Sequence, residues 1–320
     1  MIFFLLRKHI NLLIIFITLL LQFNCSTKST LLAYKELQYP SGSAIEFFQD
    51  KLYLVGDDAS HMLVLNLDFD MQDSIQLLET KARRIPKEEK PDFESITFST
   101  ISGIPYLVIL GSGSFDTVRN SGLLISVKTQ QETSFELDSL YSRFLSSGIK
   151  ELNIESITKI NDGFIIGNRG NTSYPENHLI FISDNFWNPS VKPLFKIIKI
   201  EAGRNQNFFQ GISGLSYSSL NDDLILSIST ENTPNAYDDG EIGKSYLWII
   251  KNFSSKRDSI LLKPDVIIDL NELDKSFTGH KIESVCIVSA DKNKYELVLV
   301  ADDDKGTSLL FRIRLTISPD

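Results

Sequence analysis

Residues 152–171 read LNIESITKINDGFIIGNRGN, and this stretch decides the fold. It begins as a strand that opens with an acidic residue, Glu155, turns at residues 161–163, and continues as a second apolar strand that ends in polar residues. The same unit occurs four more times along the chain. The other opening strands lie at residues 43–46, 92–97, 211–215 and 281–285, and the second strands at 51–58, 105–114, 223–231 and 296–304.

Two further apolar segments follow each unit and predict two more strands. Third strands are expected at residues 61–67, 122–127, 178–182, 245–250 and 308–313, and fourth strands at 74–78, 133–137, 194–200 and 265–270. The last unit has too few residues after Leu315 for a fourth strand, and the N-terminal segment Leu31–Leu37 can supply it.

Four-stranded units of roughly 50 residues that share one closing blade predict an all-β chain folded as a β-propeller. We expect five blades in a single domain over residues 31–320, closed by the N-terminal strand. The alternative is a degenerate sixth blade in residues 141–152 or 231–244. Helical periodicity is limited to short segments at residues 140–145 and 271–276.

The composition is that of an ordinary globular chain, with 42% hydrophobic and 23% charged residues among 320. The formal net charge is −9 and the pI is about 5.1. Binding to a nucleic-acid backbone needs a basic face, so we expect no nucleic-acid partner.

The first residues have the pattern of an export signal. The basic pair Arg7-Lys8 precedes an apolar run at residues 10–23, and Cys25 follows that run. The position of this cysteine resembles a bacterial lipoprotein signal, in which the cysteine becomes the lipidated N-terminus. The sequence departs from that signal at Asn24, which is usually a small residue, and at Gln22, which is usually aliphatic.

This resemblance implies a signal peptide over residues 1–25, lipidation of Cys25 and a polar tether over residues 26–30. The protein is then expected in the bacterial cell envelope, held to the outer membrane or cell surface through its lipid. An uncleaved anchor and plain secretion are the alternatives. Cys286 would be the one thiol left, and its apolar neighbours predict a buried structural cysteine.

The innermost strand of each blade lines the channel of a propeller, so the acids that open these strands are expected to form a ring. The predicted ring consists of Glu46, Glu94, Glu155, Ser213 and Glu283. Converging carboxylates repel one another unless a cation, a basic ligand or raised pKa values relieve them. Ca²⁺ takes six to eight oxygen ligands, so the ring predicts a metal site with calcium as the cofactor. The alternative is that these acids accept backbone hydrogen bonds and stabilise turns.

Polar residues at the ends of the second strands are expected to gather at one mouth of the channel. The candidates for ligand contact are Asp57, Asp58, Asn168, Asn171, Asp302 and Asp303. Arg169 suits a carboxylate or a phosphate. As catalytic candidates, Glu155 or Glu231 could activate water, and His280 could act as a general base, with a surface histidine as the alternative.

The basic cluster at residues 81–91 leads into the segment of Glu94. It could attract an anionic substrate over the channel mouth, or it could be a solvated connection between blades. The sequence has no GxSxG, P-loop, HExxH or CxxC motif, so it contains no recognisable nucleophile or cofactor signature.

Several stretches resemble an uncharacterised family of bacterial propeller proteins. These stretches are SGSAIE (41–46), GDD (56–58), KPDFE (90–94), GSGS (111–114) and LNIE (152–155). The resemblance covers most of the chain after the export signal and implies the fold and an envelope location. Glu231 with the loop Asp238–Gly240 is also similar to phytase-like esterase propellers, although Lys244 stands where an arginine is expected. That second resemblance implies calcium-dependent phosphoester hydrolysis.

Two functions are compatible with these features. The first is an envelope-anchored propeller that binds a cation and a small ligand or peptide at its channel mouth. Its expected partners are a small molecule, a peptide or an envelope protein, and the chain is expected to be a monomer. The second is a metal-dependent hydrolase in which the metal and Arg169 polarise phosphate and Glu155 or Glu231 activates water.

Overall fold

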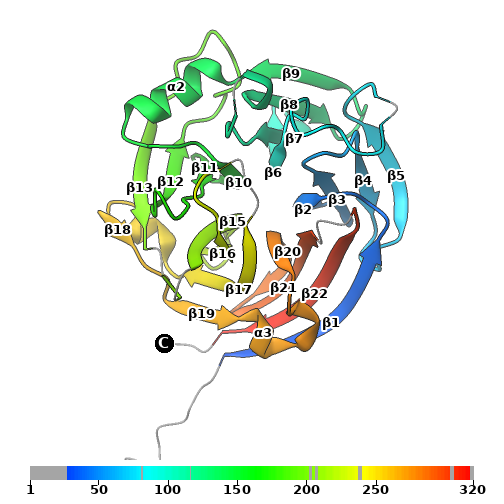
Figure 1. Cartoon of the computed structure of the whole chain (residues 1–320), viewed down its shortest axis with the longest axis vertical. Coiled ribbons are helices and arrows are strands. Elements are labelled where there is room, and N and C mark those ends of the chain that lie inside the picture. Colours follow the sequence, from blue (N-terminus) through cyan, green and yellow to red (C-terminus); the bar gives the residue numbers. More distant parts are fainter. Residues whose placement is uncertain are drawn as a thin grey trace, which may run out of the picture.

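A computed structural model describes residues 27–80, 82–115, 117–201, 204–205, 208–236, 240–302 and 306–317. Five sheets surround a central axis in Figure 1. Each contains four antiparallel strands, and two of the sheets gain a short fifth strand, β14 (Arg204–Asn205) in one and β18 (Leu261–Leu262), which pairs parallel, in the other. The chain is therefore a five-bladed β-propeller, and the prediction of five blades is confirmed. We number the blades 1 to 5 along the chain.

The four strands of each blade follow one another outward from the axis. The innermost strands are β2 (Gly42–Phe48), β6 (Phe93–Ile101), β10 (Ile154–Ile160), β15 (Phe208–Ser218) and β20 (Lys281–Asp291). The second strands are β3 (Lys51–Gly56), β7 (Ile104–Gly111), β11 (Gly163–Asn168), β16 (Asp223–Asn232) and β21 (Lys294–Asp302). The third strands are β4 (His61–Leu65), β8 (Ser121–Ser126), β12 (Asn177–Ile182), β17 (Glu241–Ile250) and β22 (Ser308–Thr316). The outermost strands are β5 (Met71–Gln76), β9 (Glu132–Glu136), β13 (Phe195–Ile200), β19 (Val266–Asp269) and β1 (Lys28–Leu37).

The N-terminal strand β1 closes blade 5, as predicted. It pairs antiparallel with β22, from Lys28 opposite Thr316 to Leu37 opposite Ser308. The strand begins three residues earlier than expected, so part of the segment predicted as a tether belongs to the sheet. The reason is that β22 extends to Thr316 and offers backbone partners to Lys28 and the residues after it.

The remaining elements are short. Helix α2 (Asp138–Ser146) and helix α3 (Leu270–Leu273) lie where helical periodicity was noted, and α2 occupies much of one segment considered for a sixth blade. The other segment considered for a sixth blade, residues 231–244, contains the C-terminal end of β16 and the N-terminal end of β17. The other short elements are 3-10 helices η1 (Thr117–Arg119), η2 (Phe253–Lys256) and η3 (Lys275–Phe277), and strands β14 (Arg204–Asn205) and β18 (Leu261–Leu262).

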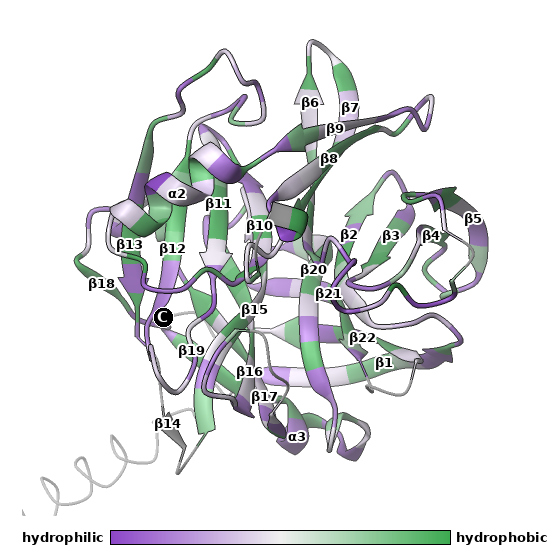
Figure 2. Ribbon diagram, turned by 45° about the horizontal axis from the view of Figure 1, so that its top comes forward, coloured by the Kyte–Doolittle hydropathy of each residue, from purple (hydrophilic) through white to green (hydrophobic). Residues whose placement is uncertain are grey.

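Apolar side chains fill the spaces between neighbouring blades. Between blades 3 and 4, Ile165 and Leu179 share a buried cluster with Leu224 and Trp248. Hydrophobic residues are concentrated along the strands in Figure 2. Complete burial of one large apolar side chain contributes about 1.5–3 kcal/mol, so the joints between blades supply much of the stability.

Cys286 is a free, buried thiol on β20, as predicted. Burial, followed by the neighbouring charge of Glu46, raises its pKa well above the ordinary value. This thiol is therefore a packing residue at neutral pH. Cys25 lies outside the described residues. Within the described part of the chain, no helix is long and apolar enough to cross a membrane.

Each innermost strand contains a β-bulge close to its start. In blade 3, Ile154 pairs with Asn168 and Ser156 with Gly167, so Glu155 is an extra residue without a partner. The same register shift occurs in the other four blades, and the bulged residues are Ser43, Glu94, Glu155, Ser213 and Glu283. A bulge bends its strand and redirects one side chain, so it sets the direction of the residue at the start of every inner strand.

Candidate functional site

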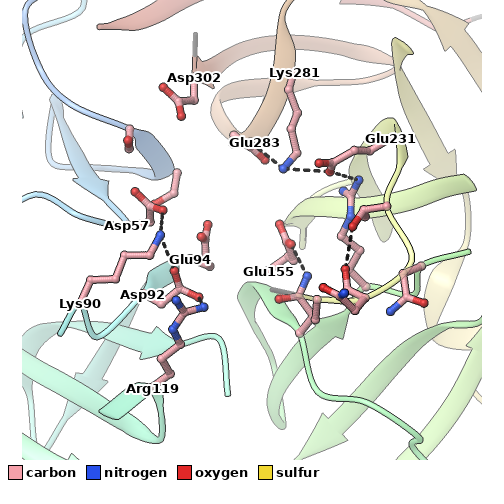
Figure 3. A pocket seen from close by; sticks show the side chains of 18 of the residues that line it. Asp57, Lys90, Asp92, Glu94, Arg119, Glu155, Glu231, Lys281, Glu283 and Asp302 are labelled. Atoms are coloured by element: carbon pink, nitrogen blue, oxygen red, sulfur yellow. Dashed lines mark hydrogen bonds and ion pairs between the residues drawn. The ribbon is translucent and has the colours of Figure 1, made fainter. Parts of the chain in front are cut away.

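Three of the five bulged residues point into a cavity on the propeller axis. They are Glu94, Glu155 and Glu283, and Figure 3 shows them around the cavity. The strict alternation of a strand would place Glu155 on the same side as buried Ile157, between blades. The bulge interrupts that alternation and directs the carboxylate to the axis.

The two bulged serines make bonds between blades. Ser43 Oγ donates to the backbone oxygen of Phe93 at 2.6 Å, and Ser213 Oγ donates to that of Ile282 at 2.6 Å. Each acceptor is the residue just before the bulge of the next blade. Ser213 is fully buried and does not line the cavity. The structure therefore places Ser213 at the predicted ring position but gives its hydroxyl a partner in the neighbouring blade.

The structure corrects the position of Glu46 in the predicted ring. Ser43 is the bulged residue of blade 1, and Glu46 lies three residues farther along β2. In the next three blades the corresponding residues carry hydroxyls that accept backbone N–H groups of the following blade at 3.2 Å. These residues are Thr97, Thr158 and Ser216.

Glu46 has the same joining role with a carboxylate. Its Oε1 accepts from the backbone N–H of Phe47 at 2.9 Å, and it also interacts with Thr97 and the backbone of Phe98 in blade 2. Burial raises its pKa to about 7, against these hydrogen bonds. For Glu46, the alternative that a strand-opening acid accepts backbone hydrogen bonds describes what the structure shows.

The axial cavity is small and charged. Its volume is about 90 Å³, several times the roughly 10–15 Å³ that one water molecule needs. Its acidic side chains are Asp57, Asp92, Glu94, Glu155, Glu231, Glu283 and Asp302. Its basic side chains are Lys87, Lys90, Arg119, Arg169 and Lys281. No aromatic residue is among the described residues that line it.

One ion-pair network lies on the side of blades 1 and 2, at the left of Figure 3. Lys90 Nζ contacts Asp57 and lies 2.7 Å from Oδ1 of Asp92. Arg119 donates to Oδ2 of Asp92 at 2.7 Å, and the hydroxyl of Ser112 donates to the same oxygen at 2.5 Å. Burial opposes ionisation of Asp92, but Lys90 and Arg119 hold its pKa below the ordinary value. Asp92 is therefore a fixed anion at neutral pH.

A second network lies on the side of blades 3 to 5. Lys281 Nζ bridges Oε2 of Glu231 at 3.2 Å and Oε1 of Glu283 at 3.1 Å. Arg169 contacts Glu231 Oε2 at 3.3 Å and donates to the hydroxyl of Ser229 at 2.7 Å. Burial opposes ionisation of Glu231, but Lys281 and Arg169 hold its pKa below the ordinary value.

The position of Arg169 depends on a glycine in the adjacent blade. A Cβ at Gly211 would lie 2.7 Å from both Cζ and Nε of Arg169. Residue 211 is two positions before the bulge of β15, where the other blades carry the side chains of Ser41, Asp92, Asn153 and Lys281. The absence of a side chain at Gly211 leaves room for the guanidinium.

The three bulged glutamates have raised pKa values. Burial is the main cause in each, and the charges of other wall carboxylates add to it. Burial and Glu155 raise the pKa of Glu283 to about 8, although Lys281 and Arg169 oppose the shift. Glu94 is raised well above its ordinary value. Protonation therefore relieves part of the repulsion expected for converging carboxylates.

The other sequence-predicted residues divide into two groups. Asp57, Arg169, Asn171, Glu231 and Asp302 line the cavity. The remainder, Asp58, Asn168, His280 and Asp303, do not meet there or cannot be placed. Asp303 lies outside the described residues.

Asp58 is paired with Arg84 at 2.5 Å. Asn168 is buried, and its Oδ1 accepts from the backbone N–H of Asn153 at 2.9 Å. His280 is not among the residues that line the cavity, and its backbone oxygen accepts from Ser245.

Sequence reasoning missed many wall residues, among them Lys90, Asp92, Arg119, Asn153 and Lys281. Asp92, Asn153 and Lys281 each stand two positions before a bulged glutamate. This recurring spacing is visible in the sequence and could have identified them. Lys90 had been noticed only within the basic cluster at residues 81–91. Arg119 reaches the wall from the connection between β7 and β8 and carried no signal.

The residues present fit a metal only in part. Asp57, Asp92 and Glu94 offer ligand atoms that lie within 4.8 Å of one another. However, the ammonium group of Lys90 already contacts Asp57 and Asp92. A metal ion at this cluster would therefore have to displace or tolerate an adjacent positive charge.

Fold and site together define a five-bladed propeller with a charged axial cavity. A family model described as a family of unknown function (DUF6929) matches residues 38–315, and the chain belongs to that family. The predicted resemblance to an uncharacterised propeller family is confirmed to this extent. No curated protein matches the chain.

Solved structures are similar to this chain at low sequence identity. Glutaminyl cyclase from Myxococcus xanthus is 9% identical, with 91% of this chain and 97% of that chain covered and a TM-score of 0.54. Virginiamycin B lyase from Staphylococcus aureus is 11% identical, with 91% and 100% covered and a TM-score of 0.36. The similarity to glutaminyl cyclase supports the propeller fold alone.

Proposed function

We propose that this protein is a binding propeller whose axial cavity takes the cationic group of a small ligand or peptide. The supporting observation is an asymmetry between acids and bases in the wall. The basic side chains of Lys90, Arg119, Arg169 and Lys281 are held by wall carboxylates. Some of the wall carboxyl groups, in contrast, have oxygens without a hydrogen-bond partner among the described residues.

Three wall carboxyl groups keep acceptor capacity. Oδ1 of Asp57 is buried without a hydrogen-bond partner among the described residues. Glu94 makes no hydrogen bond or ion pair with the described residues, and Oε2 of Glu283 is buried without a hydrogen-bond partner among them. A buried polar atom without a partner costs free energy, so a donor that enters the cavity would relieve that cost. A cation satisfies both the charge and the hydrogen-bonding requirement.

Calorimetric titration of the protein that begins at Ser26 tests this function. We expect binding of at least one cation from a series of Ca²⁺, Mg²⁺ and methylammonium, with a rise in melting temperature. The double variant Glu94→Gln, Glu283→Gln should lose that binding, and Glu46→Gln, which changes a glutamate outside the cavity, should keep it. No binding by any of these cations would contradict the proposal.

We also propose that Cys25 carries a lipid and anchors the protein in the bacterial envelope. Supporting evidence comes from the direction of β1. At one end of blade 5, Lys281 pairs with Asp302 and both line the cavity, whereas Lys28 pairs with Thr316 at the opposite end. The chain thus enters β1 on the face away from the cavity, roughly 30 Å from its mouth. Palmitate labelling that is abolished by Cys25→Ala would support the anchor, and an unlabelled protein would exclude it.

Calcium-dependent phosphoester hydrolysis is the second candidate function. It is favoured by the cluster of Asp57, Asp92 and Glu94, which could hold a metal ion. It is weakened by Arg169, because this residue is already engaged with Ser229 and Glu231. Calcium-stimulated hydrolysis of bis(p-nitrophenyl) phosphate, lost in Glu94→Gln but kept in Glu46→Gln, would establish this function in place of simple binding.

A further inference from the structure

We propose that the cavity selects a primary ammonium group, such as that of a small amine or a peptide N-terminus, over a metal ion. This inference rests on the proposed function and names the chemical class of its ligand. An ammonium group has three N–H donors. Three inner strands, β6, β10 and β20, each direct one carboxyl group to the axis, namely Glu94, Glu155 and Glu283 (Figure 3).

The clearest acceptor is Glu283. This residue is only 7% exposed and lines the cavity, and its Oε2 has no partner among the described residues, while Oε1 is held by Lys281. Glu155 uses Oε1 to accept from the amide of Asn153 at 2.6 Å. The cavity therefore has a deeply buried acceptor in a fixed orientation.

The wall already binds ammonium groups. Lys281 bridges two carboxylates at 3.1 and 3.2 Å, and Lys90 lies 2.7 Å from Asp92 while also contacting Asp57. These separations are those of N–H···O hydrogen bonds, whereas Ca²⁺ needs six to eight oxygens at 2.3–2.6 Å. Both lysines also place a positive charge among the wall carboxylates, and that charge repels a divalent metal ion about twice as strongly as a singly charged ammonium group.

The size and lining of the cavity narrow the ligand further. A cavity of about 90 Å³ is several times the roughly 10–15 Å³ that one water needs, so it has room for a small polar head group, and the rest of a larger ligand would extend through the mouth. Quaternary ammonium ligands are typically held by aromatic cages, and the described wall has no aromatic side chain. The wall therefore favours N–H donors over methylated nitrogen.

Titration calorimetry with matched ligands tests this selectivity. We expect methylammonium and a tripeptide amide with a free N-terminus to bind, and tetramethylammonium, the N-acetylated tripeptide and Ca²⁺ to bind at least tenfold more weakly. Binding of the tripeptide but not of methylammonium would identify a peptide terminus as the source, and the converse would identify a small amine. Above pH 8, where Glu283 is ionised, Glu283→Gln should weaken methylammonium binding about tenfold or more, because one charge-assisted hydrogen bond is lost.

Controls separate the two proposals. Glu46→Gln should bind like the wild type, and Glu155→Gln gives a second cavity variant if Glu283→Gln does not fold. Tighter binding of Ca²⁺ than of methylammonium would overturn the ammonium inference and leave the cation-binding function intact. Equal binding of tetramethylammonium and methylammonium would also overturn it. Absence of binding for every cation would reject both proposals.

Discussion

At the residue scale, the bulged position determines what each blade contributes to the axis. A glutamate there reaches the cavity, as Glu155 and Glu283 do, whereas a serine such as Ser213 bonds to the next blade. The long side chain extends past the backbone of its neighbour, and the short one reaches only the nearest carbonyl. The residue type at this one position therefore decides whether the inner strand of a blade adds a carboxyl group to the axis.

The pKa of Glu283 predicts how cation binding depends on pH. Burial and the charge of Glu155 raise this pKa to about 8, and the charge of Glu231 adds to the rise. Lys281 and Arg169 oppose the shift. Because a cation prefers the ionised carboxylate, the apparent affinity should rise by up to about tenfold per pH unit toward pH 8 and then level off. Titrations between pH 5.5 and 9 measure this rise, and Glu283→Gln should flatten it. An affinity independent of pH would show that Glu283 is ionised throughout or not involved.

Glu46 predicts a pH dependence of stability instead. Its folded-state pKa of about 7 exceeds its ordinary value of 4.5, so the folded protein holds a proton that the unfolded chain releases between these values. Stability should therefore fall as pH rises from 4.5 to 7, by at most about 1 kcal/mol per pH unit because the side chain is only partly buried. Urea unfolding across this range should show a smaller decline for Glu46→Gln. An identical decline in both proteins would refute the assignment.

Gly211 tests the placement of Arg169. In Gly211→Ala the new methyl group would meet the buried guanidinium at 2.7 Å, and overpacking of this kind costs about 1–3 kcal/mol. We expect a lower midpoint in urea unfolding and weaker cation binding, because Glu231 would lose one of its cationic partners. Gly103→Ala provides a control, since a Cβ there meets nothing within 4 Å, although its positive φ adds local strain. Unchanged binding in Gly211→Ala would show that the position of Arg169 is not needed.

At the element scale, β1 matters most because it closes the ring of blades. Its pairing with β22 joins residues separated by almost the whole described chain. Without β1, β22 would become an exposed sheet edge, which favours association between chains. The closing strand therefore contributes both stability and solubility.

Removal of β1 should thus have a larger effect than the loss of one outer strand suggests. We expect a protein that begins at Pro40 to unfold at a lower temperature and to associate, while one that begins at Lys28 remains monomeric. Thermal unfolding with size-exclusion chromatography measures both properties. Equal melting temperatures and elution volumes for the two proteins would show that β1 is dispensable.

At the scale of the whole molecule, the strand directions place the cavity mouth and the start of β1 on opposite faces. Lys281, Asp302 and Leu37 lie at one end of blade 5, and Lys28 and Thr316 lie at the other. An anchor that precedes β1 would therefore leave the mouth facing away from the membrane. A ligand could then reach the site without passing the lipid surface.

This arrangement predicts that the site stays open when the protein is held by its N-terminus. Immobilisation through a tag before Ser26 should leave cation affinity within about twofold of the value in solution, because the mouth lies roughly 30 Å away. Immobilisation through a cysteine introduced at Asn235, which lines the cavity, should reduce binding strongly. The opposite order, measured by surface-based binding assays, would reverse the proposed orientation.

The sequence by itself determined the strands, the number of blades and the closure by the N-terminal strand. These features arise from the alternation of apolar and polar residues and from a repeat of roughly 50 residues. Both patterns can be read along the chain without knowing which strands pair. It also placed Glu94, Glu155 and Glu283 at equivalent positions. It placed Glu46 with them wrongly, because the bulge that defines the position shows only in the register between two strands.

Tertiary structure alone decided which charges meet. Lys90 and Arg119 reach the cavity from the segments that connect strands, and Lys281 of blade 5 contacts Glu231 of blade 4. The residues of each pair are not related by any sequence pattern that would indicate contact. The raised pKa of Glu283 also depends on burial and on carboxylates supplied by other blades. Folding brings these groups together because the blades close a ring, and closure is a property of the whole chain.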